Sequence, residues 1–173
     1  MKITHIARLT GALVAAAISA GAASAQSLPL VGPPNGIAVG DFVPSSSSAK
    51  AGGSSQLSAE LRYGLPGVPL TPTRTVITAG YQGGSKDGYT STIIPLTITE
   101  YFGTGNFSPF KASQPYVGAG TGVYFINQTG KSNKTAIGGS LVAGYNFSII
   151  FAEAQYQYVP NGNGFVFSLG ARF

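Results

Sequence analysis

The sequence predicts an all-β fold, an eight-stranded, up-and-down antiparallel transmembrane β-barrel, from three observations. Only 9% of the residues are charged, whereas about 25% is typical of soluble domains. Runs of alternating apolar and polar residues are separated by clusters of Gly, Pro, Asn and Ser. After the N-terminal region, no segment is apolar for long enough to span a membrane as a helix, and a closed sheet is one way for such a chain to hide its apolar surface.

The N-terminal region predicts export. Residues 1–25 have the pattern of a cleaved signal peptide: Lys2 and Arg8, a short apolar stretch, then Ala-Ser-Ala before the expected cleavage point. The apolar stretch is too short, and too rich in Ala, Gly and Ser, for a transmembrane anchor. We interpret residues 26–35 as a Pro-rich lead-in and residues 36–173 as the barrel domain.

Strand-like segments fill the rest of the chain, and each ends in turn-forming residues. They cover residues 36–43, 55–64, 72–82, 89–101, 114–126, 134–147, 149–158 and 164–173. Several have the length of about 10 residues that a tilted membrane-crossing strand needs. The first segment is short and weakly patterned, so either it is a true eighth strand or the register differs.

Loops should then alternate between the two ends of the barrel. If the first strand runs outward, the outer loops are polar and rich in Gly and Ser, at residues 44–54, 83–88, 127–133 and 159–163. The inner connections are residues 65–71, residues 102–113 and a tight turn near Asn146–Ser148. The connection at 102–113 is longer than is typical of that side.

Each strand has one apolar face and one small or polar face. The charged residues on the polar faces are Glu60, Arg62, Arg74, Glu153 and Arg172. In a membrane barrel they would point into the lumen and pair, because an unpaired buried charge costs several kcal/mol. In a soluble barrel they would face water, and the opposite faces would form the core. Alternation alone leaves both possibilities open.

The segment GFVFSLGARF, residues 164–173, resembles the C-terminal targeting strand of Gram-negative outer-membrane β-barrel proteins. Its alternating apolar residues and final aromatic residue are Phe165, Phe167, Leu169, Ala171 and Phe173. The Gly-rich segment 115–125 is similar to a strand of small OmpA/OmpX-like eight-stranded barrels. The resemblance implies an outer-membrane location, insertion by the barrel-assembly machinery through this strand, outer-membrane lipid as partner, and a monomer.

The residue types present exclude several chemistries. The chain has no Cys, and its single His, His5, lies in the predicted signal peptide, so thiol or His-based catalysis and Cys/His metal sites are not expected. A Glu60/Glu153 carboxylate pair is conceivable, but beside three Arg we interpret it as neutralised lumen charge. The net charge of +5 is small and scattered, which argues against a nucleic-acid partner. We expect no cofactor and no catalytic residues.

An eight-stranded barrel has a lumen just wide enough for side chains to fill. We therefore expect a structural or surface-interaction role, not a general diffusion pore and not an enzyme. The alternatives are a soluble exported β-barrel that binds a small apolar ligand, and a lipid-modifying outer-membrane enzyme.

Overall fold

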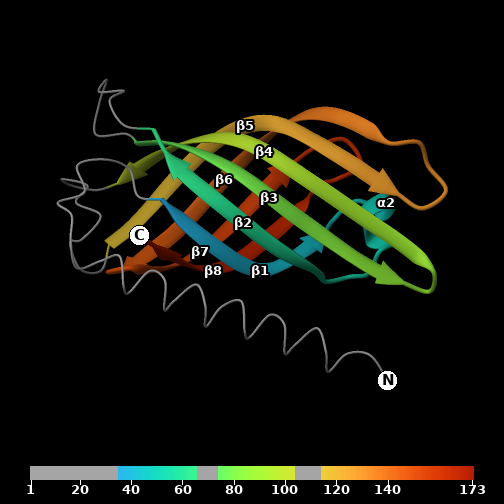
Figure 1. Cartoon of the computed structure of the whole chain (residues 1–173), viewed down its shortest axis with the longest axis horizontal. Coiled ribbons are helices and arrows are strands. Elements are labelled where there is room, and N and C mark those ends of the chain that lie inside the picture. The colour runs from blue at the N-terminus through green and yellow to red at the C-terminus, as the bar shows by residue number, and fades with distance from the viewer. Residues whose placement is uncertain (1–34, 66–73, 104–113) are drawn as a thin grey trace.

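In the computed structural model, eight antiparallel strands close into a barrel in the order of the chain (Figure 1). The structure describes residues 35–65, 74–103 and 114–173. Its elements are β1 (Gly36–Pro44), α2 (Ser47–Lys50), β2 (Gln56–Gly64), β3 (Arg74–Lys86), β4 (Tyr89–Gly103), β5 (Gln114–Gln128), β6 (Lys134–Phe147), β7 (Ile150–Tyr158) and β8 (Gly164–Arg172). The predicted all-β, up-and-down antiparallel architecture is confirmed.

The first segment is a true eighth strand. β1 pairs with β2 on one side and closes the barrel on the other, where Gly36 lies opposite Arg172 and Pro44 opposite Gly164. Its apolar pattern is weak because several lumen-facing positions are small. At Gly40, a Cβ atom would overlap the backbone of β8.

The predicted outer loop at 83–88 is wrong over most of its length. β3 continues to Lys86, which pairs with Tyr89, so only Asp87 and Gly88 form the turn. Their φ angles of 51° and 81° are both in the left-handed region. A two-residue turn of this kind matches the twist of a hairpin, so the strands extend up to it.

The tight turn expected near Asn146–Ser148 is present one residue further along. Phe147 pairs with Ile150, and Ser148 has a φ of 67°. The four-residue helix α2, in the connection between β1 and β2, was not predicted. Four residues are too few to show helical periodicity.

Other predictions lie outside the described residues. They concern the signal peptide (1–25), the lead-in (26–35) except its last residue, and nearly all of the connections 65–71 and 102–113. Among the residues that are described, no helix is long and apolar enough to cross a membrane.

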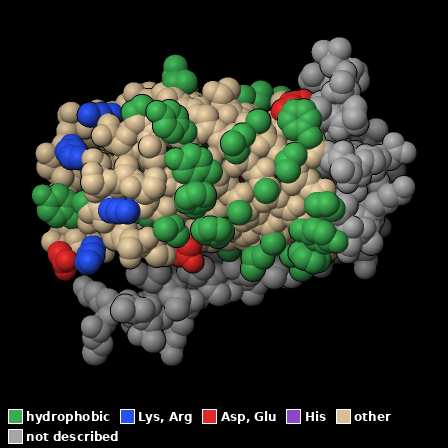
Figure 2. Space-filling view, turned by 180° about the vertical axis from the view of Figure 1, so that it is seen from behind, with side chains coloured by type: hydrophobic (Ala, Val, Ile, Leu, Met, Phe, Trp, Pro, Cys, Tyr) green, Lys and Arg blue, Asp and Glu red, His purple; other side chains and the backbone are tan. Residues whose placement is uncertain are grey.

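Side chains alternate between the lumen and the outer face along the strands, and the large exposed apolar residues lie on the outer face. In β8, Val166 and Ser168 are buried in the lumen, whereas Phe165, Phe167 and Leu169 are exposed on the outside. Every strand contributes at least one large exposed apolar side chain, and Figure 2 shows hydrophobic side chains spread over the face of the barrel in view. We call this surface the apolar belt.

Large side chains fill the lumen in layers. We call the end with α2 and the Asp87–Gly88 turn the loop end, and the end where β1 begins and β8 ends the terminal end. Towards the loop end lies a buried cluster of Phe42, Ala49, Ile93, Tyr124, Ile126, Val159 and Val166. Towards the terminal end lies a second cluster of Val76, Tyr101, Tyr116 and Val142, which surrounds charged groups.

Candidate functional site

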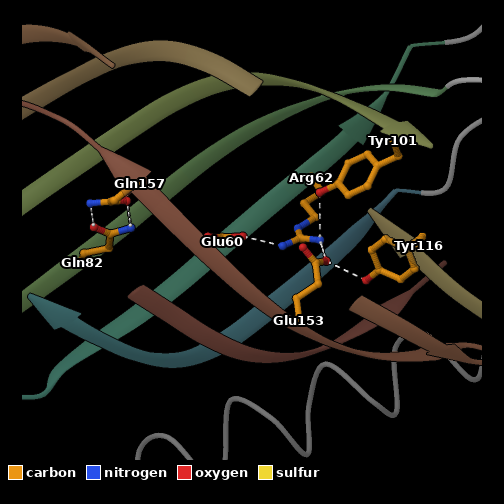
Figure 3. A network of polar contacts seen from close by, with 7 residues as sticks. All are labelled: Glu60, Arg62, Gln82, Tyr101, Tyr116, Glu153 and Gln157. Atoms are coloured by element: carbon orange, nitrogen blue, oxygen red, sulfur yellow. Dashed lines mark hydrogen bonds and ion pairs between the residues drawn. The ribbon is translucent and has the colours of Figure 1, made fainter. Parts of the chain in front are cut away.

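The charged residues of β2 and β7 meet inside the barrel. Glu60 and Arg62 lie two residues apart on β2 and therefore share its lumen face, and Glu153 reaches them from β7 (Figure 3). One guanidinium nitrogen of Arg62, Nη2, is 2.7 Å from Glu60 Oε2, and the other, Nη1, pairs with Glu153 Oε2. All three side chains are buried. We call these residues the lumen charge cluster.

Two tyrosines add hydrogen bonds to this cluster. Tyr116 donates from its hydroxyl to Glu153 Oε2 over 2.9 Å, and Arg62 Nη1 donates to the Tyr101 hydroxyl over 3.4 Å. The two rings meet edge to face, with centroids 5.6 Å apart. Because buried charges are costly unless they are paired and hydrogen-bonded, these tyrosines help to hold the cluster in one arrangement.

A second arginine approaches the cluster through aromatic rings. The guanidinium carbon of Arg172 lies 5.0 Å from the centre of the Phe151 ring and 5.5 Å from that of Tyr116. The guanidinium carbon of Arg62 lies 4.7 Å from the same Phe151 ring. Phe151 thus makes cation–π contacts with both arginines. Among the side chains that the structure describes here, Arg62 and Arg172 balance Glu60 and Glu153 in charge.

The structure brings together four of the five charged residues that the sequence assigned to the lumen. Arg74 lies on β3 opposite Tyr101, and its side chain is outside what the structure describes. Sequence reasoning missed Tyr101, Tyr116 and Phe151. The available signal was strand parity, since Tyr116 shares the lumen face of its strand with Gly118, Gly120 and Gly122.

A pair of glutamines forms the next polar layer towards the loop end. Gln82 on β3 and Gln157 on β7 exchange two hydrogen bonds of 2.9 Å across the lumen (Figure 3). Gln157 also donates to the backbone carbonyl of Gly162 over 2.8 Å. Both side chains are fully buried, so this layer spans the lumen between the charged and apolar layers.

The residues predicted for insertion lie mainly on the outer face of β8. Phe165, Phe167 and Leu169 are exposed there, as expected, and the two Phe rings lie 6.2 Å apart. Ala171 differs: it lies between Ile37 and Ile150 on the neighbouring strands and is only 5% exposed. Phe173 is half-buried, and its N–H donates to the carbonyl of Asn35 over 3.1 Å.

Metal-ligating side chains do not cluster in the part of the chain that the structure describes. Within residues 35–65, 74–103 and 114–173, no three His, Cys, Asp or Glu side chains gather into a group that could hold a metal ion. Both carboxylates of the lumen charge cluster are engaged by Arg62. In the structure, both acids are therefore ion-paired.

Comparison with known proteins gives a match in fold. No family model matches the chain, and no curated protein is similar to it in sequence. The crystal structure of Neisserial surface protein A aligns with a TM-score of 0.61, over 80% of this chain and 93% of that one, at 18% identity. This similarity confirms the predicted fold of small eight-stranded outer-membrane barrels.

Two further structures align with lower scores. The N-terminal β-barrel domain of Pseudomonas aeruginosa OprF aligns over 82% of this chain and 98% of that one, with a TM-score of 0.46 and 20% identity. The Yersinia pestis outer membrane protein Ail, in a phospholipid bilayer nanodisc, aligns over 82% of this chain and 100% of that one, with a TM-score of 0.46 and 12% identity.

Proposed function

We propose that the chain is an outer-membrane barrel protein with a structural or surface-interaction role. The observation that carries the proposal is the inside-out polarity of the barrel. Large apolar side chains are exposed on the outer face of every strand, whereas Glu60, Arg62 and Glu153 are buried in the lumen. A soluble barrel needs the reverse arrangement, because its apolar faces form the core. Surrounding lipid removes the apolar belt from water, at about 25 cal/mol per Å² of apolar surface.

Fractionation of cells that express the protein tests this role. We expect the chain in the membrane fraction after washing with salt, and its release only with detergent. Extracted protein should migrate differently on a gel before and after boiling, because folded barrels resist the detergent. Recovery in the salt-washed soluble fraction would favour the soluble alternative instead. Light scattering should give the mass of a monomer, since the closed barrel leaves no strand edge of the described sheet unpaired.

We infer that the barrel is not a general diffusion pore. In support, the lumen holds the charge cluster, the glutamine pair, and the apolar cluster with Phe42, Tyr124 and Val159. A lumen filled in this way leaves little room for solutes. Proteoliposomes that contain the protein should not swell in sugar solutions, and swelling at the rate of a porin would overturn the inference.

We also infer that the protein is not an enzyme. The candidate catalytic pair, Glu60 and Glu153, is held by Arg62 and by Tyr116, which supports a structural role for both acids. The sole His of the chain lies in the predicted signal peptide. Mass profiles of lipid A from cells with and without the protein should be the same. A new acylated or deacylated species would support the lipid-modifying alternative.

The signal peptide and the terminal strand would guide assembly. We propose that residues 1–25 direct export and that the outward face of β8 is recognised by the barrel-assembly machinery. The exposed Phe165, Phe167 and Leu169 support this, since they offer an alternating apolar face. Phe173→Ser should lower the amount of heat-modifiable protein in the membrane several-fold, whereas Phe173→Tyr, which keeps the aromatic ring, should not.

A refolding control separates targeting from packing. Purified Phe173→Ser protein, diluted from urea into detergent micelles, should reach the folded form as fully as the unchanged chain. If the serine variant also fails to refold in micelles, Phe173 acts through packing. If it assembles normally in cells, the targeting role is wrong.

A further inference from the structure

A pocket lined mainly by residues with polar side chains lies at the loop end. It has a volume of about 290 Å³ and lies between α2 and the adjacent ends of β4 and β5. Ser48, Tyr89, Thr90, Thr129 and Lys131 are among the residues that line it. Neither the lumen charge cluster nor the apolar belt accounts for these side chains.

Hydrogen bonds define the walls of this loop-end pocket. Lys131 donates from Nζ to Ser48 Oγ over 2.8 Å and so links the β5–β6 connection to α2. The Thr129 hydroxyl oxygen accepts from the Thr90 N–H over 2.9 Å, and the Thr129 N–H donates to the Thr90 carbonyl over 3.0 Å. Two strand ends and the helix are thereby held together around the pocket.

The pocket carries a positive charge without a carboxylate in its lining. Its charged side chain is Lys131, and the other lining residues are hydroxyl, amide or small side chains. The hydroxyl of Ser48 orients the ammonium group but does not neutralise it. The site is therefore suited to an anionic group on the ligand.

The surrounding surface has the same sign. Lys50, Lys86, Lys131 and Lys134 are all exposed at the loop end, and Figure 2 shows Lys and Arg side chains gathered at one end of the barrel. The nearby described acids are Asp87, in the β3–β4 turn, and Asp41, which accepts a hydrogen bond from Ser55. A local excess of lysine attracts anions and raises their concentration near the pocket.

The size and lining of the pocket define the ligand. The pocket volume of about 290 Å³ lies at the lower limit of small-molecule sites, roughly 300 Å³, so the pocket suits a ligand of sugar size rather than a macromolecule. Hydroxyl and amide side chains match the hydroxyl groups of a saccharide, and an ammonium group binds phosphate strongly. The exposed ring of Tyr89 offers an apolar surface to the C–H face of a sugar.

We propose that the loop-end pocket binds a phosphorylated saccharide. Its ligand is either the phosphosugar headgroup of a glycolipid in the same membrane or a free sugar phosphate. The proposal adds a ligand to the surface-interaction role. It can be tested apart from that role, because reconstitution of the protein reports membrane insertion before any ligand is added.

Calorimetry on the protein in phosphatidylcholine nanodiscs tests the site, with glucose 6-phosphate as the probe. We expect saturable binding that is tighter than the binding of either glucose or inorganic phosphate. Lys131→Gln should weaken it by about tenfold, the loss expected for one charge-assisted hydrogen bond. Lys86→Gln, a lysine at the same end but outside the pocket lining, should weaken it less than about twofold.

A second arm distinguishes the sources of the ligand. Phosphorylated lipid A is added to the nanodiscs, and glucose 6-phosphate binding is measured again. Loss of that binding identifies the membrane headgroup as the occupant, and unchanged binding identifies a free sugar phosphate. The proposal is overturned if neither probe binds saturably, or if Lys131→Gln and Lys86→Gln weaken binding equally. Heat-modifiable migration confirms that both variants are folded.

Discussion

Among single residues, Glu153 links charged and hydroxyl groups from different strands of the lumen. One of its carboxylate oxygens accepts hydrogen bonds from both Arg62 and Tyr116, which come from different strands. Without this carboxylate, the two arginines near Phe151 would face Glu60 alone. Breaking a buried pair by removing one partner costs about 3–5 kcal/mol, because the remaining charge is uncompensated.

Glu153→Gln should therefore lower the free energy of unfolding by about 3 kcal/mol. Urea unfolding in detergent micelles, followed by the gel shift of the folded form, measures this change. Glu100→Gln is the matched control, because Glu100 lies outside the lumen cluster and accepts a 2.7 Å hydrogen bond from Thr75. It should lose about 1 kcal/mol or less. Equal losses in the two variants would contradict the role of Glu153.

Adjacent glycines on β6 test the packing of the lumen. A Cβ atom on Gly138 would lie 2.6 Å from a methyl group of Val159 and 3.0 Å from the Tyr124 ring, whereas one on Gly139 would have its nearest contact at 3.6 Å. Overpacking costs about 1–3 kcal/mol, so Gly138→Ala should lower the urea midpoint, and Gly139→Ala should not. A barrel with spare space in this layer would tolerate both changes alike.

At the scale of the element, the β3–β4 hairpin depends on its two-residue turn. Asp87 and Gly88 both have positive φ, and a Cβ atom on Gly88 would meet no other atom within 4 Å. Gly88→Ala should thus destabilise the fold by about 1 kcal/mol through backbone conformation alone. Asp87→Asn should be neutral, since Asn tolerates the left-handed region. Thermal unfolding compares them, and an unchanged Gly88→Ala variant would argue against this turn type.

The strands could be predicted from the sequence because alternation with a period of two is a local signal. The prediction of strand ends is wrong where turn geometry, rather than local composition, determines how far the strands pair. The turn composition of Gly-Gly-Ser-Lys predicts a loop at residues 83–86, but the Asp87–Gly88 turn lets the ladder continue. The short, small-residue segment 36–43 is a different case, since it was predicted as a strand and its pairing with β2 and β8 confirms that prediction.

The site could be predicted in part for the same reason. Glu60 and Arg62 share one face of one strand, so their proximity follows from the pleat. The contact between Arg62 and Glu153 joins two strands that do not pair with each other, and it depends on the width and stagger of the closed barrel. Local alternation carries no information on these quantities, so Tyr101 and Tyr116 were also missed.

At the scale of the whole molecule, polarity varies in two directions. Across the wall, apolar side chains lie outside, and the buried charges of the lumen cluster lie inside. Along the axis, the described lysines lie at the loop end, where Figure 2 shows Lys and Arg side chains gathered. In a membrane, this second gradient predicts that the loop end protrudes into water while the middle of the barrel contacts acyl chains.

A tryptophan introduced by mutation can report how deep its position lies in the membrane, because the chain contains no other tryptophan. Leu141, in the middle of β6, is 65% exposed on the belt, and Tyr89, at the loop end, is 52% exposed. In bilayers of lipid brominated in the middle of the acyl chain, Leu141→Trp fluorescence should be quenched several-fold more than Tyr89→Trp fluorescence. Aqueous iodide should give the opposite order, because only the loop-end residue then faces water. Equal quenching of both residues by either agent would mean that the apolar belt is not the surface in contact with lipid.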